Sequence, residues 1–192
     1  AIRVRPTHSN IRFPGLGVGG YCLTKDPAFA PASVRTLCIQ EKLEFPFSTL
    51  TRKTNQEMPL HTLSRLETLL ETSVAEKSVL VLGVSYKQDV GDTRYSPVEI
   101  LVSALEERGA HVTCYDPFID VWAEKDRELP REIPAANTFQ AVVIATSHSE
   151  FQDLDLLKWL RGARPIILDT VNVVNKGQRE KCRGEGVRIE SI

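Results

Sequence analysis

The pattern of apolar and polar residues divides this chain into a helical part and a part with strands. Apolar residues recur every three or four positions across residues 26–77, a spacing typical of amphipathic helices. Helices are predicted over residues 26–42, 48–58 and 60–70. Pro59 is expected to interrupt or kink the helical pattern, because proline removes a backbone donor. The first part is therefore predicted to be a helical region with little β-structure.

From residue 78 the pattern changes to short, uninterrupted apolar runs. Residues 79–82 read Val-Leu-Val-Leu, which is typical of a strand buried on both faces of a sheet. A helix is expected to begin after the N-cap Ser96, with Pro97 first, and to end before Gly109. Because strands alternate with helices, the chain is predicted to be an α/β protein in which residues 78–192 form a Rossmann-like domain with a parallel sheet. Further strands are predicted at residues 111–115, 141–145, 165–168 and 187–190, and a further helix near 154–160.

Composition and charge exclude several classes of function. The 192 residues carry a net charge of -1, with 42% hydrophobic and 26% charged residues, as in ordinary globular domains. A nearly neutral chain lacks the electrostatic signature of a protein that binds nucleic acid or an acidic membrane. No apolar run approaches the length of a membrane span and no signal peptide is visible, so we expect a cytoplasmic protein. The cysteines are scattered without a C-x-x-C pair, so no metal site is predicted.

A glycine-rich loop within residues 1–25 is the first candidate for chemistry. Residues 15–20 satisfy the spacing G-x-G-x-x-G, but residues 1–13 carry no strand pattern, and we therefore reject a dinucleotide-binding motif there. Cys22 follows the glycines, and helical geometry would place Asp26 on the same face. A flexible loop that brings a thiol close to a carboxylate is typical of covalent catalysis. The alternative is a structural loop with an incidental cysteine.

A long polar loop after the first strand is the second candidate. It offers the cations Lys87 and Arg94 and leads into the helix that begins after Ser96. Two cations beside a helix N-terminus suit a phosphate or pyrophosphate. The alternative is a solvated loop whose charged side chains pair locally. The remaining candidates are interpreted mainly as hydrogen-bonding, capping or core residues: His148, Asp116, Asp169, Cys38, Cys114 and Cys182.

Four blocks of sequence resemble the UDP-glucose/GDP-mannose dehydrogenase family of nucleotide-sugar 6-dehydrogenases. Residues 19–27, Gly-Gly-Tyr-Cys-Leu-Thr-Lys-Asp-Pro, resemble the active-site signature of the family, and residues 82–97 resemble a loop of its C-terminal domain. The blocks at residues 109–117 and 145–151 follow in the order of the family, so the resemblance covers nearly the whole chain. It implies an active-site loop, a central helical dimerisation region at residues 26–77 and a UDP-sugar-binding domain.

The resemblance implies an NAD-dependent oxidation of the C6 alcohol of a UDP-sugar to a uronic acid. Cys22 would be the nucleophile that forms a thiohemiacetal and then a thioester, and Asp26 would position or activate the hydrolytic water. Lys25, a cation near the thiol, would favour the thiolate and, with Arg94, would contact the cofactor NAD. Lys87 would contact the UDP-sugar. The glycines that would let the loop approach the sugar nucleotide are Gly17, Gly19 and Gly20.

The sugar stays open between a UDP-N-acetylaminosugar, such as UDP-N-acetylmannosamine, and UDP-glucose. The glycine spacing before Cys22 is more similar to the N-acetylaminosugar branch of the family. Thr24 and Lys25 are more similar to the glucose branch, whereas Tyr21 departs from both.

The resemblance also implies parts and partners beyond these residues. Members of the family have an N-terminal NAD-binding domain that these residues do not resemble, so the isolated chain is expected to be inactive. A homodimer through residues 26–72 and a role in nucleotide-sugar metabolism and polysaccharide biosynthesis are implied as well. The alternative is a non-enzymatic nucleotide-binding or dimerisation module of the same fold. A flavodoxin-like signalling domain would explain residues 78–192 alone.

Overall fold

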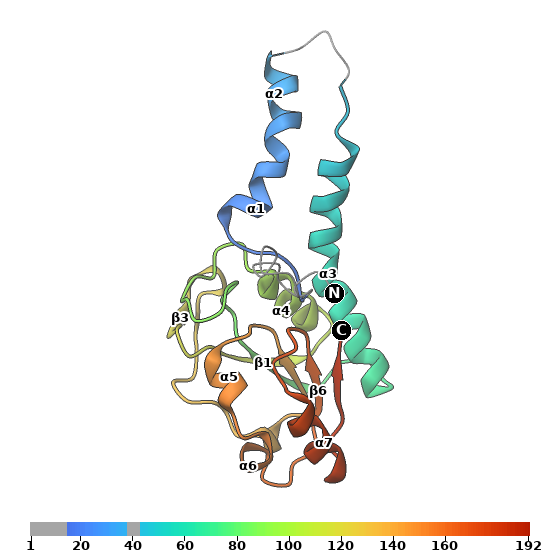
Figure 1. Cartoon of the computed structure of the whole chain (residues 1–192), viewed down its shortest axis with the longest axis vertical. Coiled ribbons are helices and arrows are strands. Elements are labelled where there is room, and N and C mark those ends of the chain that lie inside the picture. The colour runs from blue at the N-terminus through green and yellow to red at the C-terminus, as the bar shows by residue number, and fades with distance from the viewer. Residues whose placement is uncertain (1–14, 38–42) are drawn as a thin grey trace.

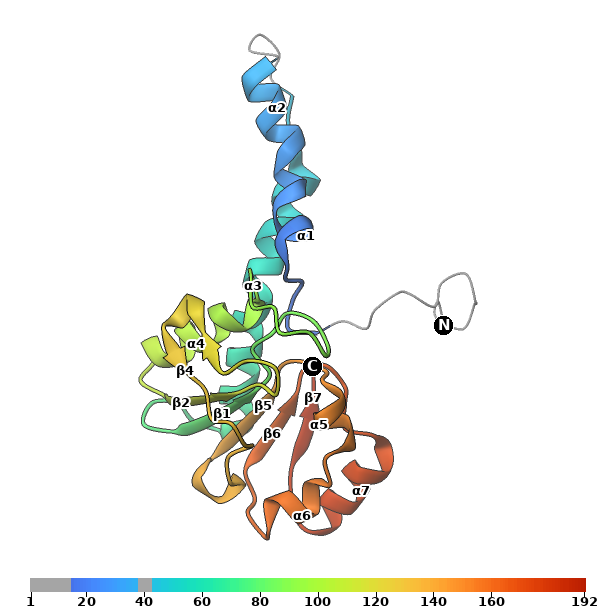
Figure 2. The same ribbon diagram turned by 90° about the vertical axis from the view of Figure 1, so that its left-hand side faces the viewer.

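The helical part of the chain forms an arm that projects from an α/β domain (Figures 1 and 2). The computed structural model describes residues 15–37 and 43–192. Residues 1–14 of the predicted loop and Cys38 lie outside this description. The arm consists of α1 (Tyr21–Lys25), the 3-10 turn η3 (Asp26–Ala28), α2 (Phe29–Leu37) and the long helix α3 (Pro46–Leu70).

Two details of the arm differ from the prediction. The predicted loop at residues 1–25 ends in a helical turn, because α1 begins directly after Gly20, whose φ is 84°. Pro59 does not interrupt α3, which is a single helix of 25 residues. Pro59 is buried together with Leu63, Leu66 and Leu69, and this packing against the domain offsets the hydrogen bond that proline removes. In the described ranges, no helix has both the length and the apolar character needed to cross a membrane.

A sheet of five parallel strands is the centre of the domain, as predicted, with the order β2-β1-β5-β6-β7. Each strand lies within two residues of its predicted position. Polar loops follow the carboxyl ends of the strands, where ligands of open α/β sheets bind. The strands are β1 (Ser78–Leu82), β2 (His111–Tyr115), β5 (Ala141–Ile144), β6 (Ile166–Asp169) and β7 (Ile189–Ser191).

Alternate residues of β1 belong to two hydrophobic cores on opposite faces of the sheet. Val79 and Val81 join the core that α3 covers, whereas Leu80 and Leu82 join the core on the other face. Because both faces are covered, β1 requires an uninterrupted apolar run. The first face is also covered by α4 (Pro97–Glu107), and the second by α5 (Ser149–Asp153), α6 (Leu156–Leu160) and α7 (Lys176–Gly184).

The predicted start of α4 is confirmed, and it orients the loop before it. The Ser96 hydroxyl oxygen accepts a hydrogen bond from the Val98 N–H at 3.3 Å, and Pro97 is the first helical residue. Gly109 follows the end of the helix with a φ of 82°, a conformation that favours glycine.

The shortest elements of the domain and its most polar helix were not predicted. The helix predicted near residues 154–160 is confirmed as α6, which begins after the N-cap Asp155, whose side chain accepts a hydrogen bond from the Lys158 N–H at 3.2 Å. The helix α5 before it was not predicted. The sequence of α7 is strongly polar and Cys182 is its buried residue, so it lacks an apolar stripe. The short antiparallel pair β3 (Val121–Trp122) and β4 (Arg127–Glu128) was missed as well.

Candidate functional site

The glycine loop before α1 is held against the loop that joins β1 to α4. The Gly20 N–H donates a hydrogen bond to the Arg94 carbonyl oxygen at 3.1 Å. A Cβ atom on Gly19 would lie 2.5 Å from the Tyr86 Cβ atom, and one on Gly20 would lie 2.8 Å from the Tyr86 ring. Such a close approach requires residues without side chains. The two candidate loops of the sequence therefore lie together in one site.

Cys22 is exposed in the short helix α1 and carries the thiol of this site. The Asp26 N–H donates a hydrogen bond to the Cys22 carbonyl oxygen, so the two residues are one turn apart and share a face. The Lys25 ammonium lies 3.7 Å from the Asp26 carboxylate and 4.4 Å from the centroid of the Tyr21 ring. Lys25 is thus engaged by a carboxylate and an aromatic ring, and its predicted effect on the thiol stays a prediction.

Arg94 is the second cation of the site. Its Nε and Nη2 atoms donate hydrogen bonds to the Asp92 carboxylate at 2.9 and 2.6 Å. This pairing raises the pKa of Arg94 above its ordinary value, so the guanidinium stays charged. Arg94 therefore pairs locally, yet its side chain is 66% exposed, and Lys87 in the same loop is exposed as well.

The buried carboxylate of Asp116, after β2, fixes the start of this cationic loop. Its Oδ2 atom accepts hydrogen bonds from the Val84 N–H at 2.8 Å and from the N–H and hydroxyl of Ser85, both at 2.9 Å. Its Oδ1 atom accepts from the Phe118 N–H at 2.9 Å. Burial alone would raise the pKa of Asp116, but the hydrogen bonds from His148 and the backbone hold it below its usual range. Asp116 is a capping residue, as interpreted from the sequence.

His148 connects the end of β5 to the same loop. Its Nδ1 atom accepts a hydrogen bond from the Asp89 N–H at 2.9 Å, which assigns the hydrogen of the neutral ring to Nε2. Nε2 lies 3.1 Å from Asp116 Oδ2. The ring is fully buried against Phe118 and Phe151. With both nitrogens bonded and no exposed surface, His148 is a structural residue rather than a catalyst.

Asp169 holds the loop after β6 in a similar way. Its carboxylate is fully buried and accepts hydrogen bonds from the Val173 and Val174 N–H groups at 3.1 and 2.9 Å. Arg179 donates a further hydrogen bond at 2.6 Å. The strand-end carboxylates therefore shape the loops, and Cys114 and Cys182 are buried as expected.

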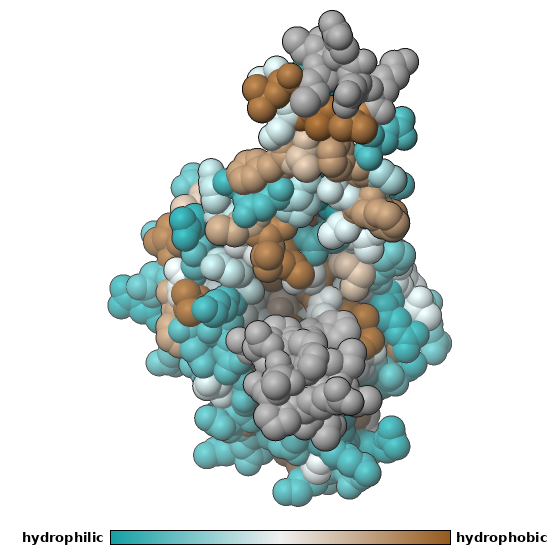
Figure 3. Space-filling model, turned by 45° about the horizontal axis from the view of Figure 1, so that its top comes forward, coloured by the Kyte–Doolittle hydropathy of each residue, from teal (hydrophilic) through white to brown (hydrophobic). Residues whose placement is uncertain are grey.

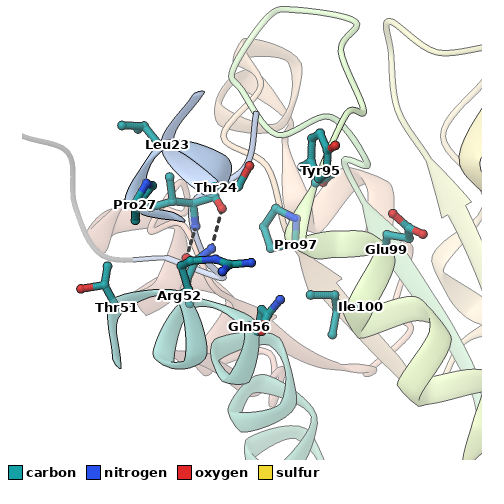
Figure 4. A pocket seen from close by; sticks show the side chains of 13 residues that line it. Leu23, Thr24, Pro27, Thr51, Arg52, Gln56, Tyr95, Pro97, Glu99 and Ile100 are labelled. Carbon is teal, nitrogen blue, oxygen red and sulfur yellow. Dashed lines mark hydrogen bonds between the residues drawn. The ribbon is translucent and has the colours of Figure 1, made fainter. Parts of the chain in front are cut away.

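A cavity of about 410 Å³ lies beside α1, between the glycine loop, α3 and the start of α4 (Figure 4). Leu23 and Pro27 form part of its largely apolar wall, whereas Cys22 does not line it. Asn55 on α3 also lines this cavity, and its side chain bonds to the glycine loop. Sequence reasoning missed Asn55, because a single asparagine in a helix carries no pattern that distinguishes it from a surface residue.

The fold and the paired loops agree with a comparison against known families. Residues 80–176, half of the chain, match the UDP binding domain of the UDP-glucose/GDP-mannose dehydrogenase family. The chain belongs to this family, as its four sequence blocks indicate.

Similar proteins have been named for two kinds of UDP-sugar. UDP-N-acetyl-D-mannosamine dehydrogenase of Methanocaldococcus jannaschii is 30% identical over 94% of this chain and 39% of its own length. UDP-glucose 6-dehydrogenase of Rickettsia bellii is 28% identical over 86% of this chain and 39% of its own length. The crystal structure of NDP-N-acetyl-D-galactosaminuronic acid dehydrogenase from Methanosarcina mazei superimposes with a TM-score of 0.80 at 27% identity, over 96% of this chain and 40% of that one. The chain thus spans about two fifths of the length of these proteins.

Proposed function

We propose that this chain supplies the thiol loop and the UDP-binding domain of a UDP-sugar 6-dehydrogenase. The hydrogen bond from Gly20 to Arg94 carries the proposal, because it joins the loop that bears Cys22 to the loop that bears Lys87. A nucleophile and the cations suited to a nucleotide are thereby brought together. Membership of the family and the names of the similar proteins support the same activity.

Cys22 is the nucleophile in this proposal. Its thiolate adds to the C6 aldehyde of the sugar to form a thiohemiacetal, and loss of a hydride from C6 gives a thioester. Water then releases the uronic acid, and Asp26 positions or activates that water. The exposure of Cys22 and its shared face with Asp26 support these roles.

NAD is the cofactor in this proposal, and when bound it accepts the hydride that leaves C6. Arg94 fits a pyrophosphate, because its guanidinium is charged and largely exposed. Lys25 offers a second cation, and its ammonium group also forms an ion pair with the Asp26 carboxylate. In this proposal the dinucleotide-binding domain belongs to a further part of the full-length protein, because the chain spans only about two fifths of the length of its relatives.

The full-length protein provides the direct test of this function. It is incubated with NAD and, in turn, with UDP-N-acetylmannosamine, UDP-N-acetylgalactosamine and UDP-glucose, and formation of NADH and uronic acid is measured. Turnover of one of these sugars is expected, and its uronic acid would be a product of the kind used in the proposed polysaccharide biosynthesis. No NADH with any sugar would favour the non-enzymatic nucleotide-binding or dimerisation module.

Binding of UDP tests the nucleotide site in the chain itself. Lys87→Ala is expected to weaken binding of UDP by about tenfold, because it removes a charge-assisted hydrogen bond to phosphate. Isothermal titration calorimetry measures the change. Lys181→Ala removes an exposed lysine of α7 and is the matched control. Equal affinities of the Lys87 variant and the unchanged chain would contradict the assignment.

The arm pairs with a second copy of the chain in this proposal. No residue of α2 is buried, and large apolar side chains near the tip of the arm are exposed, with Phe47 83% and Leu37 79% exposed. Figure 3 shows hydrophobic surface on the arm. Such an exposed patch marks an interaction site. Pairing across residues 26–72 would bury it.

A charged residue introduced near the tip of the arm tests this pairing. Phe47→Glu is expected to shift the mass in solution from twice 21.5 kDa towards 21.5 kDa, because burying a carboxylate in an apolar interface is costly. Multi-angle light scattering at micromolar concentration measures the mass. Ile192→Glu, an exposed apolar residue outside the arm, is the control. A monomeric mass for the unchanged chain would contradict the pairing.

A further inference from the structure

Asn55 holds the glycine loop to α3 through a pair of reciprocal hydrogen bonds. Its Nδ2 atom donates to the Val18 carbonyl oxygen at 2.8 Å, and its Oδ1 atom accepts from the Val18 N–H at 2.8 Å. One amide side chain therefore satisfies both backbone groups of a single loop residue. This arrangement fixes the position and the direction of the loop at that point.

The loop is shaped to fit this contact. A Cβ atom on Gly17 would lie 3.0 Å from the Pro97 Cβ atom and 3.4 Å from Asn55 Oδ1, and Gly17 has a φ of 152°. Leu16, next to it, is buried in the core that α3 covers. Pro59, four residues after Asn55, removes the N–H that would bond to the Asn55 carbonyl in a regular helix. The Asn55 carbonyl oxygen therefore receives no helical hydrogen bond from position 59.

The anchor at Val18 lies close to the thiol along the chain. Val18 is anchored to α3, and Gly20 is anchored to the Arg94 carbonyl oxygen. The Thr24 hydroxyl also donates to the Gly20 carbonyl oxygen at 2.7 Å, which ties α1 to the same loop. Cys22 follows Val18 by four residues, so these anchors fix the segment that leads into the thiol.

We infer that Asn55 is a positioning residue, which holds Cys22 in line with the C6 atom of a substrate bound to the UDP-binding domain. This inference rests on the proposed function. Asn55 acts through the loop and leaves the nucleotide contacts of Lys87 unchanged. Its loss is therefore expected to lower kcat by about tenfold to a hundredfold while KM for the UDP-sugar stays within about twofold.

Two substitutions of Asn55 test its two hydrogen bonds to Val18 separately. Asn55→Ala removes both hydrogen bonds, so exchange of the Val18 amide hydrogen is expected to accelerate by about tenfold or more. Asn55→Asp keeps an acceptor for the Val18 N–H but places a carboxylate oxygen against the Val18 carbonyl oxygen. In this variant the amide is expected to stay protected while kcat still falls. Hydrogen exchange is measured on the chain, and kcat and KM on the full-length protein.

Gln56→Ala is the matched control, because Gln56 is the next residue of α3 and lines the same cavity. It is expected to change neither the exchange of Val18 nor kcat. Unchanged exchange in Asn55→Ala would overturn the inference, as would a faster exchange without a fall in kcat. The exchange measurement needs no turnover, so absence of activity in the unchanged protein would refute the proposed function without deciding whether Asn55 anchors the loop.

Discussion

Replacing Cys22 with serine is expected to lower the rate of uronic acid formation by the full-length protein by about a thousandfold or more. A serine hydroxyl has a far higher pKa than a thiol, so it provides almost no anionic nucleophile at neutral pH. The thioester could then not form, and the aldehyde would be the end of the oxidation. Mass spectrometry of the sugar products measures uronic acid directly and distinguishes it from the aldehyde.

A second cysteine provides the control for this experiment. Cys182 is fully buried on α7, and Cys182→Ala removes a thiol without touching the glycine loop. This variant is expected to be less stable but to keep its rate of uronic acid formation per folded molecule. Full activity of Cys22→Ser would assign the loop to the structural alternative and the oxidation to another group.

Asp116→Ala is expected to lower the free energy of unfolding by about 3–5 kcal/mol. This is the usual cost of removing one partner from a buried pair of charged groups. The substitution leaves the N–H groups of Val84 and Ser85 without their acceptor and removes the partner of His148. Urea denaturation of the chain measures the change. Asp153→Ala, at an exposed carboxylate of α5, is expected to change the free energy by less than about 0.5 kcal/mol.

The dependence of stability on pH provides a second test of the role of Asp116. The pKa of Asp116 is lower in the folded chain than its ordinary value of about 3.9. Its contribution to stability is therefore complete above that ordinary value, and is lost as the pH falls through the folded pKa. Asp116→Ala is expected to weaken the dependence of stability on pH in that acidic window. An unchanged pH dependence would contradict the assigned role of Asp116.

Periodicity and capping predicted the elements with apolar patterns. The uninterrupted run of β1 and the N-cap Ser96 are local features, so the sequence alone places them. In contrast, Cys182 is the single buried residue of α7, and polar contacts hold the rest of this helix. They include the hydrogen bond from Arg179 to Asp169 and the cap at Asn175, whose side chain accepts from the Gln178 N–H at 2.9 Å. A helix with so little apolar surface has no periodic signal.

The contacts within the site depended on distant parts of the chain. The thiol, the carboxylate and the cations were identified as candidates from their types and spacing, and the shared face of Cys22 and Asp26 was predicted as well. The contact between the glycine loop and the cationic loop was not predicted from the residues. The glycines of the loop were expected to approach a sugar nucleotide, and two of them instead meet Tyr86 of the protein itself, while their contact with substrate stays a prediction. Asn55 and Val18 are 37 residues apart, and no local pattern relates them.

Because α3 is one continuous helix, the rotation of the arm relative to the domain depends on the number of residues in this helix. The half of α3 before Pro59 has no buried residue, whereas the half from Pro59 onwards is packed into the domain. Each residue inserted into or deleted from the first half would turn the tip of the arm by about 100° relative to the sheet. A second chain seated on the tip would turn with it. If two chains pair through the tip, insertions and deletions in this helix should be tolerated only near whole turns, unless the surface that the tip presents changes at the same time.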